Sequence, residues 1–341
     1  MSEKGKLNAI TDVMGIKVGH FTDLEHLTGV TVVRTPEGSL GGVDVRGGSP
    51  GTRETDLLSP VNRIKRVDAV SLCGSSAFGL NAVAGVMRSL EESGIGHPIA
   101  EGRVVPIVPA AVIYDLCRGE SDRYIDEAAG YEACSSASGG PVEQGNVGAG
   151  TGALSGGTKG GLGTASEVLE NGITVAAIIV VNSSGTAFDP ETGGFYARGL
   201  ELGGEFSSLR RDLPAKMVPR PVLYRKQGQH TTIGVIATDA QLDKSQATKM
   251  AQMAHDGLAR AIYPAHTMFD GDTLFSVATG TRGALGEYTS DSKDGDRALS
   301  QIGVSAADAV SRAVIHAIIS ADTVGKYTCY SDKFPDSFWP S

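Results

Sequence analysis

One segment in the second half of the chain constrains the fold more than any other. Residues 232–239 are β-branched or small and apolar up to the closing aspartate, a pattern that predicts a strand buried on both faces. Residues 225–229 before it are polar and include a glycine, which is typical of an exposed loop. The chain is therefore expected to pass from solvent into the core at Thr231.

Thr231 has two interpretations at this boundary. In the first, Thr231 and Thr232 simply begin the strand, and the segment alone favours this interpretation because threonine is common in strands. In the second, the peptide bond between His230 and Thr231 breaks. Thr231 then becomes a new N-terminus whose α-amine serves as the base for its own hydroxyl, as in a self-cleaving hydrolase.

The remaining apolar pattern predicts strands and helices in irregular alternation. Apolar runs predict strands at 69–73, 104–114 and 175–181, and helical periodicity is present at 241–263 and 304–321. Several of the strands begin or end in glycine-rich loops. This arrangement favours a layered α/β sandwich over the regular strand–helix alternation of a dinucleotide-binding fold.

Composition limits the partners that the chain can have. The net charge of −9 disfavours nucleic acid and anionic membranes as partners, because nothing offsets phosphate repulsion. The N-terminus has no apolar signal region, and we expect no apolar run long enough to cross a bilayer. The four cysteines are widely spaced, without a metal-binding pattern, and are expected to be buried free thiols. We therefore expect a cytoplasmic protein that binds no metal.

The glycine-rich residues 144–153 look superficially like a dinucleotide-binding loop. No strand is predicted before them and no clear helix after them, and Lys159 just beyond does not complete a P-loop pattern. A non-enzymatic nucleotide-binding module is therefore the least favoured of the functions considered, and no cofactor is expected.

Several longer motifs occur in one order along the chain, at residues 42–56, 112–115, 147–152, 181–182, 231–234 and 270–273. Together they resemble the L-aminopeptidase/D-esterase family of self-processing N-terminal-nucleophile hydrolases, which includes β-peptidyl aminopeptidases and nylon-oligomer endohydrolases. The resemblance extends from about Asn8 to Ala321. It implies an α-β-β-α sandwich of the aminopeptidase/ornithine-acetyltransferase-like type.

The resemblance also implies roles for individual residues. Thr231 is similar to the family's nucleophile, which is released when the bond after His230 is cut. Asn182 resembles the amide donor of the oxyanion hole, a contribution of about 3–4 kcal/mol. Lys159 resembles a lysine close to the nucleophile, where its charge favours the deprotonated form, and Tyr114 resembles a tyrosine of the substrate pocket. A surface lysine and a core tyrosine are the alternatives for these last two positions.

Asp270 and Asp272 stand where the aminopeptidase branch of the family has serine and glutamate, and the Asp-Gly-Asp form is similar to the nylon-oligomer branch. Two residues apart on an extended segment, the carboxylates point the same way. We predict that they orient the Thr231 α-ammonium and share a proton, so that one of them titrates high. A simple turn is the alternative, and a calcium loop is disfavoured because too few oxygen ligands are near in sequence.

His230 is the clearest departure from the family's pattern, which has asparagine in the nylon-oligomer branch and glycine in some aminopeptidases. The attacked carbonyl belongs to the backbone, so a histidine does not prevent an acyl shift. We expect it to alter the rate, with slow or incomplete processing. The alternative is an ordinary exposed loop residue.

The expected protein is thus a single α/β hydrolase domain, residues 1–341, cut into a large subunit, 1–230, and a small subunit, 231–341. Its substrates are expected to be short peptides or linear amide oligomers, with 6-aminohexanoate oligomers among them. The alternatives are an aminopeptidase for β-peptides or D-amino-acid amides and esters, and an acyltransferase similar to ornithine acetyltransferase. The resemblance implies a homo-oligomer, commonly of four processed units.

Overall fold

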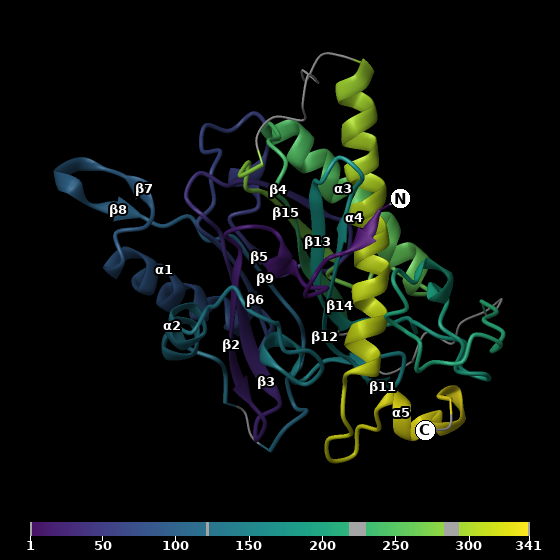
Figure 1. Cartoon of the computed structure of the whole chain (residues 1–341). Helices are drawn as coiled ribbons and strands as arrows, with labels where there is room; N and C mark the ends of the chain where they lie inside the picture. The colour runs from purple at the N-terminus through teal and green to yellow at the C-terminus, as the bar shows by residue number, and fades with distance from the viewer. Residues whose placement is uncertain (1, 121–122, 218–229, 283–292, 340–341) are drawn as a thin grey trace.

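The computed structural model describes residues 2–120, 123–217, 230–282 and 293–339. Within them the chain forms four layers, in the order helices, sheet, sheet, helices (Figure 1). This confirms the α-β-β-α sandwich. The loop expected at 225–229 lies outside the described residues.

The first sheet, here called sheet A, has six strands. In spatial order they are β1 (Glu3–Lys4), β12 (Gly161–Val168), β13 (Thr174–Asn182), β14 (Thr231–Thr238), β15 (Thr273–Ala278) and β4 (Leu40–Val45). All neighbours are antiparallel except β14 and β15, which run parallel. All eight residues of β14 are buried, so the predicted core strand is confirmed.

The second sheet, sheet B, consists of five strands: β2 (Lys17–Asp23), β3 (Thr28–Arg34), β6 (Ala69–Cys73), β9 (Ala110–Val112) and β5 (Thr52–Arg53). The single strand expected at 104–114 is wrong. Pro106 and Pro109, which have no N–H for a ladder, separate β9 from β8 (Val104–Val105). β8 instead pairs with β7 (His97–Pro98), and β10 (Leu154–Ser155) forms a second small hairpin with β11 (Thr158–Lys159).

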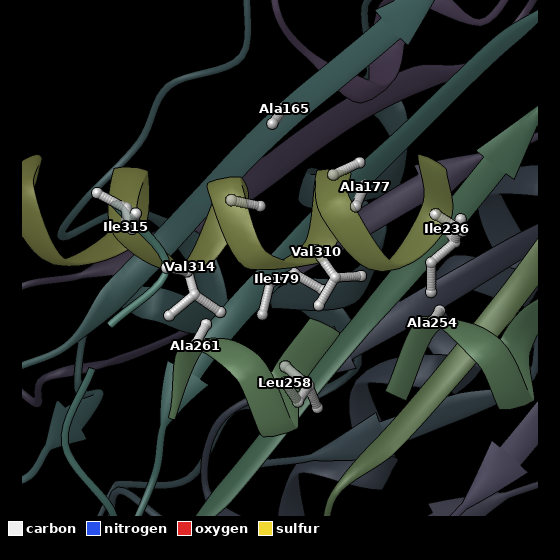
Figure 2. Close-up of a cluster of buried hydrophobic side chains, with 14 of the residues drawn as sticks. Ala165, Ala177, Ile179, Ile236, Ala254, Leu258, Ala261, Val310, Val314 and Ile315 are labelled. Atoms are coloured by element: carbon white, nitrogen blue, oxygen red, sulfur yellow. The ribbon is translucent and has the colours of Figure 1, made fainter. Parts of the chain in front are cut away.

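Alternation along β13 shows how sheet A sits between two cores. Successive side chains of a strand point to opposite faces. Val175, Ala177, Ile179 and Val181 belong to the core beneath α3 (Lys244–Ala261) and α4 (Lys293–Ile319), part of which Figure 2 shows. Ala176, Ile178 and Val180 belong to the core between the two sheets. β13 and β14 are therefore held from both sides, which fixes the position of their ends.

The outer face of sheet B is covered by α1 (Ala82–Glu92) and α2 (Glu127–Ser135), which share a third core with β3, β6 and β9. A short helix, α5 (Tyr330–Lys333), lies near the C-terminus. Cys73, Cys134 and Cys329 are buried free thiols as expected, but Cys117 is exposed.

The helix α4 corrects one expectation about membranes. By length and composition alone, its span Asp294–Ile319 is long and apolar enough to cross a bilayer. However, 78% of the apolar window is buried within the fold, where it packs on β12, β13 and α3. Burial in the core of the protein accounts for its apolar composition.

Candidate active site

Thr231 and Asn182 lie opposite one another at the same end of sheet A. Thr231 is the first residue of β14, Asn182 is the last residue of β13, and the antiparallel register pairs them. Directly opposed residues have their Cα atoms about 4.5–5.5 Å apart. Both residues are buried, with relative exposures of 5% and 0%. The structure therefore brings together the two residues that the resemblance gives as nucleophile and oxyanion donor.

The peptide bond before Thr231 is held by its neighbours. The carbonyl oxygen of His230 accepts a hydrogen bond from the Thr231 hydroxyl at 2.5 Å. The same oxygen accepts the Gly271 N–H at 3.1 Å. A Cβ added to Gly271 would lie 2.9 Å from Thr231 Oγ1, so a larger residue would crowd the hydroxyl. A hydroxyl and a carbonyl that accepts a second donor are thus adjacent.

Asp270 and Asp272 flank this glycine, and both are buried. Asp270 accepts the Ser184 N–H at 3.2 Å and the Thr267 N–H and hydroxyl at 2.9 and 2.6 Å. Asp272 Oδ1 accepts the Thr232 N–H at 2.7 Å. Burial, and next the charge of Asp272, raise the pKa of Asp270. Asp272 is therefore bonded to the residue after Thr231, and Gly271, between the two aspartates, is bonded to the carbonyl before Thr231.

Arg118, which sequence reasoning missed, fixes the side chain of Asn182. Its Nη1 donates to Asn182 Oδ1 at 2.6 Å, and the Leu154 N–H donates to the same oxygen at 3.0 Å. Two donors identify that atom as the amide oxygen, so Nδ2 is the donor end. Nδ2 donates to the Tyr114 carbonyl at 3.2 Å. The structure thus connects Tyr114 to the site through its backbone.

The charge of Arg118 is balanced by Asp115. This carboxyl is buried and accepts the Ser75 N–H at 2.6 Å. Burial raises the pKa of Asp115 to about 6, against the opposing charge of Arg118. Burial lowers the pKa of the Arg118 guanidinium, and Asp115 opposes that change. No sequence motif around Arg118 predicts these contacts, because Arg118 and Asn182 at the end of β13 come together only in the folded chain.

Lys159 is buried, so the alternative of a surface lysine is wrong. Its Nζ donates to the carbonyl oxygens of Gly150, Ala153 and Gly160 at 3.2, 3.0 and 2.8 Å. An ammonium has three N–H donors, and these carbonyls occupy all of them. Burial, and next Arg118, lower the pKa of Lys159 to about 7.

The position of Lys159 follows from the register of sheet A. It ends β11, just before Gly161, which pairs with Val181 beside Asn182. Lys159 therefore lies at the same end of the sheet as Thr231. Among the described contacts, its hydrogen bonds go to the three carbonyls and not to Thr231.

His230 is half-buried, so its interpretation as an exposed loop residue is wrong. Its ring makes a hydrogen bond with the backbone of Asn182, and its backbone forms a parallel bridge with Asp270. Burial, and next the charge of Arg118, lower the pKa of His230 to about 4, so the ring is neutral at pH 7. The histidine side chain is therefore part of the wall of the site.

The described residues around the site do not suit a metal ion or a nucleotide. Within the described ranges no three His, Cys, Asp or Glu residues are grouped to hold a metal ion. Asp270 and Asp272 each accept three hydrogen bonds already, which leaves too few oxygen ligands for a metal ion. Residues Gly148–Gly150 form one 3-10 turn that leads into β10, without the strand–turn–helix frame of a dinucleotide loop.

Residues 8–329 of the chain match the sequence pattern of peptidase family S58. An uncharacterized aminopeptidase of Mycobacterium tuberculosis is 44% identical, over 97% of this chain and 99% of the relative. A 6-aminohexanoate-oligomer endohydrolase of Kocuria sp. is 32% identical, over 79% of this chain and 74% of the relative.

Solved structures agree with these sequence matches. The β-aminopeptidase of a Burkholderia species has a TM-score of 0.67 at 25% identity, and the match covers 100% of this chain and 97% of that one. The L-aminopeptidase D-Ala-esterase/amidase of Ochrobactrum anthropi, described as a variant of the Ntn-hydrolase fold, has a TM-score of 0.67 at 23% identity, over 95% and 89% of the two chains. The second likeness concerns the fold alone. On this evidence the chain belongs to peptidase family S58 and is an amide-bond hydrolase.

Proposed function

We propose that this hydrolase cuts its own chain between His230 and Thr231, and that the freed Thr231 then hydrolyses short linear amides. The observation that carries the proposal is the contact of the Thr231 hydroxyl with the carbonyl oxygen of His230. The same carbonyl accepts the Gly271 N–H, a donor suited to the charge that develops during attack.

Self-cleavage proceeds as an acyl shift from nitrogen to oxygen. The Thr231 Oγ attacks the carbonyl carbon of His230, and the hydroxyl proton passes to the leaving amide nitrogen. The C–N bond breaks and an ester joins His230 to Thr231. Water then cleaves the ester, which leaves a carboxylate on His230 and a free α-amine on Thr231.

In turnover, the α-amine of Thr231 accepts the proton of its own hydroxyl as the oxygen attacks the substrate carbonyl. Asn182 donates to the oxyanion through Nδ2, which Arg118 fixes by holding the amide oxygen. The amine of the substrate leaves with the proton, and water releases the acyl group from Thr231. In this scheme Asp270 and Asp272 orient the α-ammonium.

Lys159 and Tyr114 have supporting parts in the same scheme. In its protonated form, Lys159 at this end of sheet A favours the deprotonated state of the nucleophile. Tyr114 lines the substrate pocket and holds Asn182 through its carbonyl. We also propose that the processed units assemble as a cytoplasmic homotetramer.

Two classes of substrate have support. The Asp-Gly-Asp segment and the 32% identity to a 6-aminohexanoate-oligomer endohydrolase favour linear 6-aminohexanoate oligomers. The higher identity, 44%, to a protein named as an aminopeptidase favours short peptides with a free N-terminus. Both classes are linear amides, and one acyl-enzyme mechanism serves both.

A substrate panel tests the proposal. Purified protein is given 6-aminohexanoate oligomers, L-aminoacyl, D-aminoacyl and β-aminoacyl amides, and N-acetylornithine with glutamate. We expect release of amine from at least one amide, retained in Thr231→Ser and lost in Thr231→Ala. Amide hydrolysis by Thr231→Ala would exclude Thr231 as the nucleophile. Acetyl transfer to glutamate without amide hydrolysis would instead indicate an acyltransferase.

A further inference from the structure

One residue, His266, donates two hydrogen bonds to the carboxylate of Asp272. We propose that His266 is a positioning residue that fixes the Asp272 carboxylate for self-cleavage and turnover at Thr231. The inference rests on the proposed function, and it assigns a task to a residue outside the motifs that identified the site.

His266 bonds Asp272 through both its backbone and its ring. Asp272 Oδ2 accepts the backbone N–H of His266 at 3.0 Å and the ring Nδ1 at 2.7 Å. Asp272 Oδ1 accepts the Thr232 N–H at 2.7 Å. Both carboxylate oxygens are therefore bonded, one to the loop and one to the residue after Thr231. With three donors on two oxygens, the carboxylate has one orientation.

The backbone of His266 has an uncommon conformation that makes this double contact. Its φ is +57°, in the left-handed region that is uncommon for residues other than glycine, although asparagine, aspartate and histidine adopt it more often than the rest. Only 3% of the Asp272 side chain and 19% of the His266 side chain are exposed, so water has little access to their contact. The loop thus adopts this less common conformation at the point where it meets the carboxylate.

The hydrogen bonds also determine which ring nitrogen carries the proton. Because a carboxylate only accepts, Nδ1 of His266 is the protonated nitrogen in this contact. The ring packs edge-to-face on His255, with centroids 4.9 Å apart. His255 Nε2 lies 2.9 Å from the Asp44 carbonyl oxygen, so Nε2 of that ring is the donor. Nδ1 of His255 then carries a lone pair.

Among the residues that the structure describes, no second cationic side chain forms an ion pair with Asp272. Burial lowers the pKa of His255 to about 4, so that ring is neutral at pH 7. Behind it lie Asp44 and Arg46, which form an ion pair of their own at 2.7 Å. Within the described residues, Nε2 of His266 is buried without a hydrogen-bond partner. The described contact that orients the ring is therefore the one to Asp272.

Two amide substitutions test this role. Asparagine places an amide nitrogen where histidine has Nδ1, whereas glutamine places it where histidine has Nε2. We expect His266→Asn to keep self-cleavage and kcat within about tenfold of wild type, and His266→Gln to lower both by about 100-fold, with KM little changed. His266→Gly controls for the backbone, because glycine suits the positive φ but has no donor. It should be as slow as His266→Gln.

A double-mutant cycle tests whether His266 acts through Asp272. Self-cleavage is followed by intact mass in His266→Gly, Asp272→Asn and the double variant, and thermal unfolding confirms that each is folded. We expect the second substitution to add less than about threefold to the first. Fully additive losses would overturn the inference, as would equal rates for His266→Asn and His266→Gln. Either of these two outcomes would leave the proposed function intact. A wild-type protein that neither cuts itself nor hydrolyses amides would overturn both the proposed function and the role of His266.

Discussion

The buried lysine of the site gives a stability prediction with a definite sign. Lys159 is 1% exposed, and burial lowers its pKa from 10.5 to about 7. The native chain therefore loses this proton near pH 7, while the unfolded chain keeps it up to about pH 10.5. Unfolding takes up a proton between these values, so the lysine's contribution to stability rises with pH across that window and is constant below it.

The magnitude follows from the linkage. One pH unit within the window corresponds to about 1.36 kcal/mol, so between pH 7.5 and 9.5 the contribution rises by about 2.7 kcal/mol. We expect the free energy of unfolding of the native sequence to rise by this amount relative to Lys159→Met. Methionine has a similar length and does not titrate. Any other effect of the substitution on the free energy of unfolding is therefore the same at each pH in this range.

The assay is urea unfolding at pH 7.5, 8.5 and 9.5, with both chains carrying Thr231→Ala so that a single uncut polypeptide unfolds. A difference that stays constant with pH would refute the reasoning. It would mean that the carbonyl oxygens of Gly150, Ala153 and Gly160 hold the lysine fully charged throughout.

Lys244 provides a matched control for activity. Its Nζ also donates to three carbonyl oxygens, those of Leu57, Asn62 and Ile64. We expect Lys244→Met in the cleavable chain to leave self-cleavage and turnover unchanged, while Lys159→Met slows both. Equal losses in the two variants would reduce Lys159 to a structural residue.

Three further substitutions have expected outcomes. Asn182→Ala should lower kcat on the best amide by about 10²–10³-fold, as for other lost oxyanion donors; a change below tenfold in steady-state kinetics would contradict that role. Gly271→Ala should slow self-cleavage in a gel time course, because its Cβ would lie 2.9 Å from Thr231 Oγ1; wild-type cleavage would show that the loop gives way. Arg118→Met should destabilise the fold by about 3 kcal/mol at pH 7.5, because the Asp115 charge loses its partner. That loss should shrink below pH 6, where Asp115 is protonated; a loss independent of pH in urea unfolding would contradict this.

The strands that carry the site could be predicted from the sequence, because their residues are apolar in the chain itself. The apolar run at 175–181 corresponds to β13, and 232–239 corresponds to β14. Their mutual register could not be predicted, since it is determined by pairing between segments distant in sequence. The contact between Thr231 and Asn182 was expected only from the family resemblance.

Arg118 and His266 were missed for a related reason. Both lie in loops, and their chemistry depends on partners that folding brings close. Arg118 reaches Asn182 across 64 positions. His266 is near Asp272 in sequence, but its contact depends on a positive φ, and the pattern had no glycine or asparagine to indicate that conformation. The hydrogen-bond donors that hold the side-chain oxygens of Asn182 and Asp272 can be identified only once the fold is known.

The central claim is that Thr231 becomes an N-terminus, and one measurement addresses it directly. Purified wild-type protein and Thr231→Ala are incubated side by side, and their fragments are weighed by intact mass spectrometry and sequenced from the N-terminus. We predict two wild-type fragments, the smaller beginning Thr-Thr-Ile-Gly, and a single uncut Thr231→Ala chain. An amide-hydrolysing wild-type preparation that contains only the uncut chain would contradict the account.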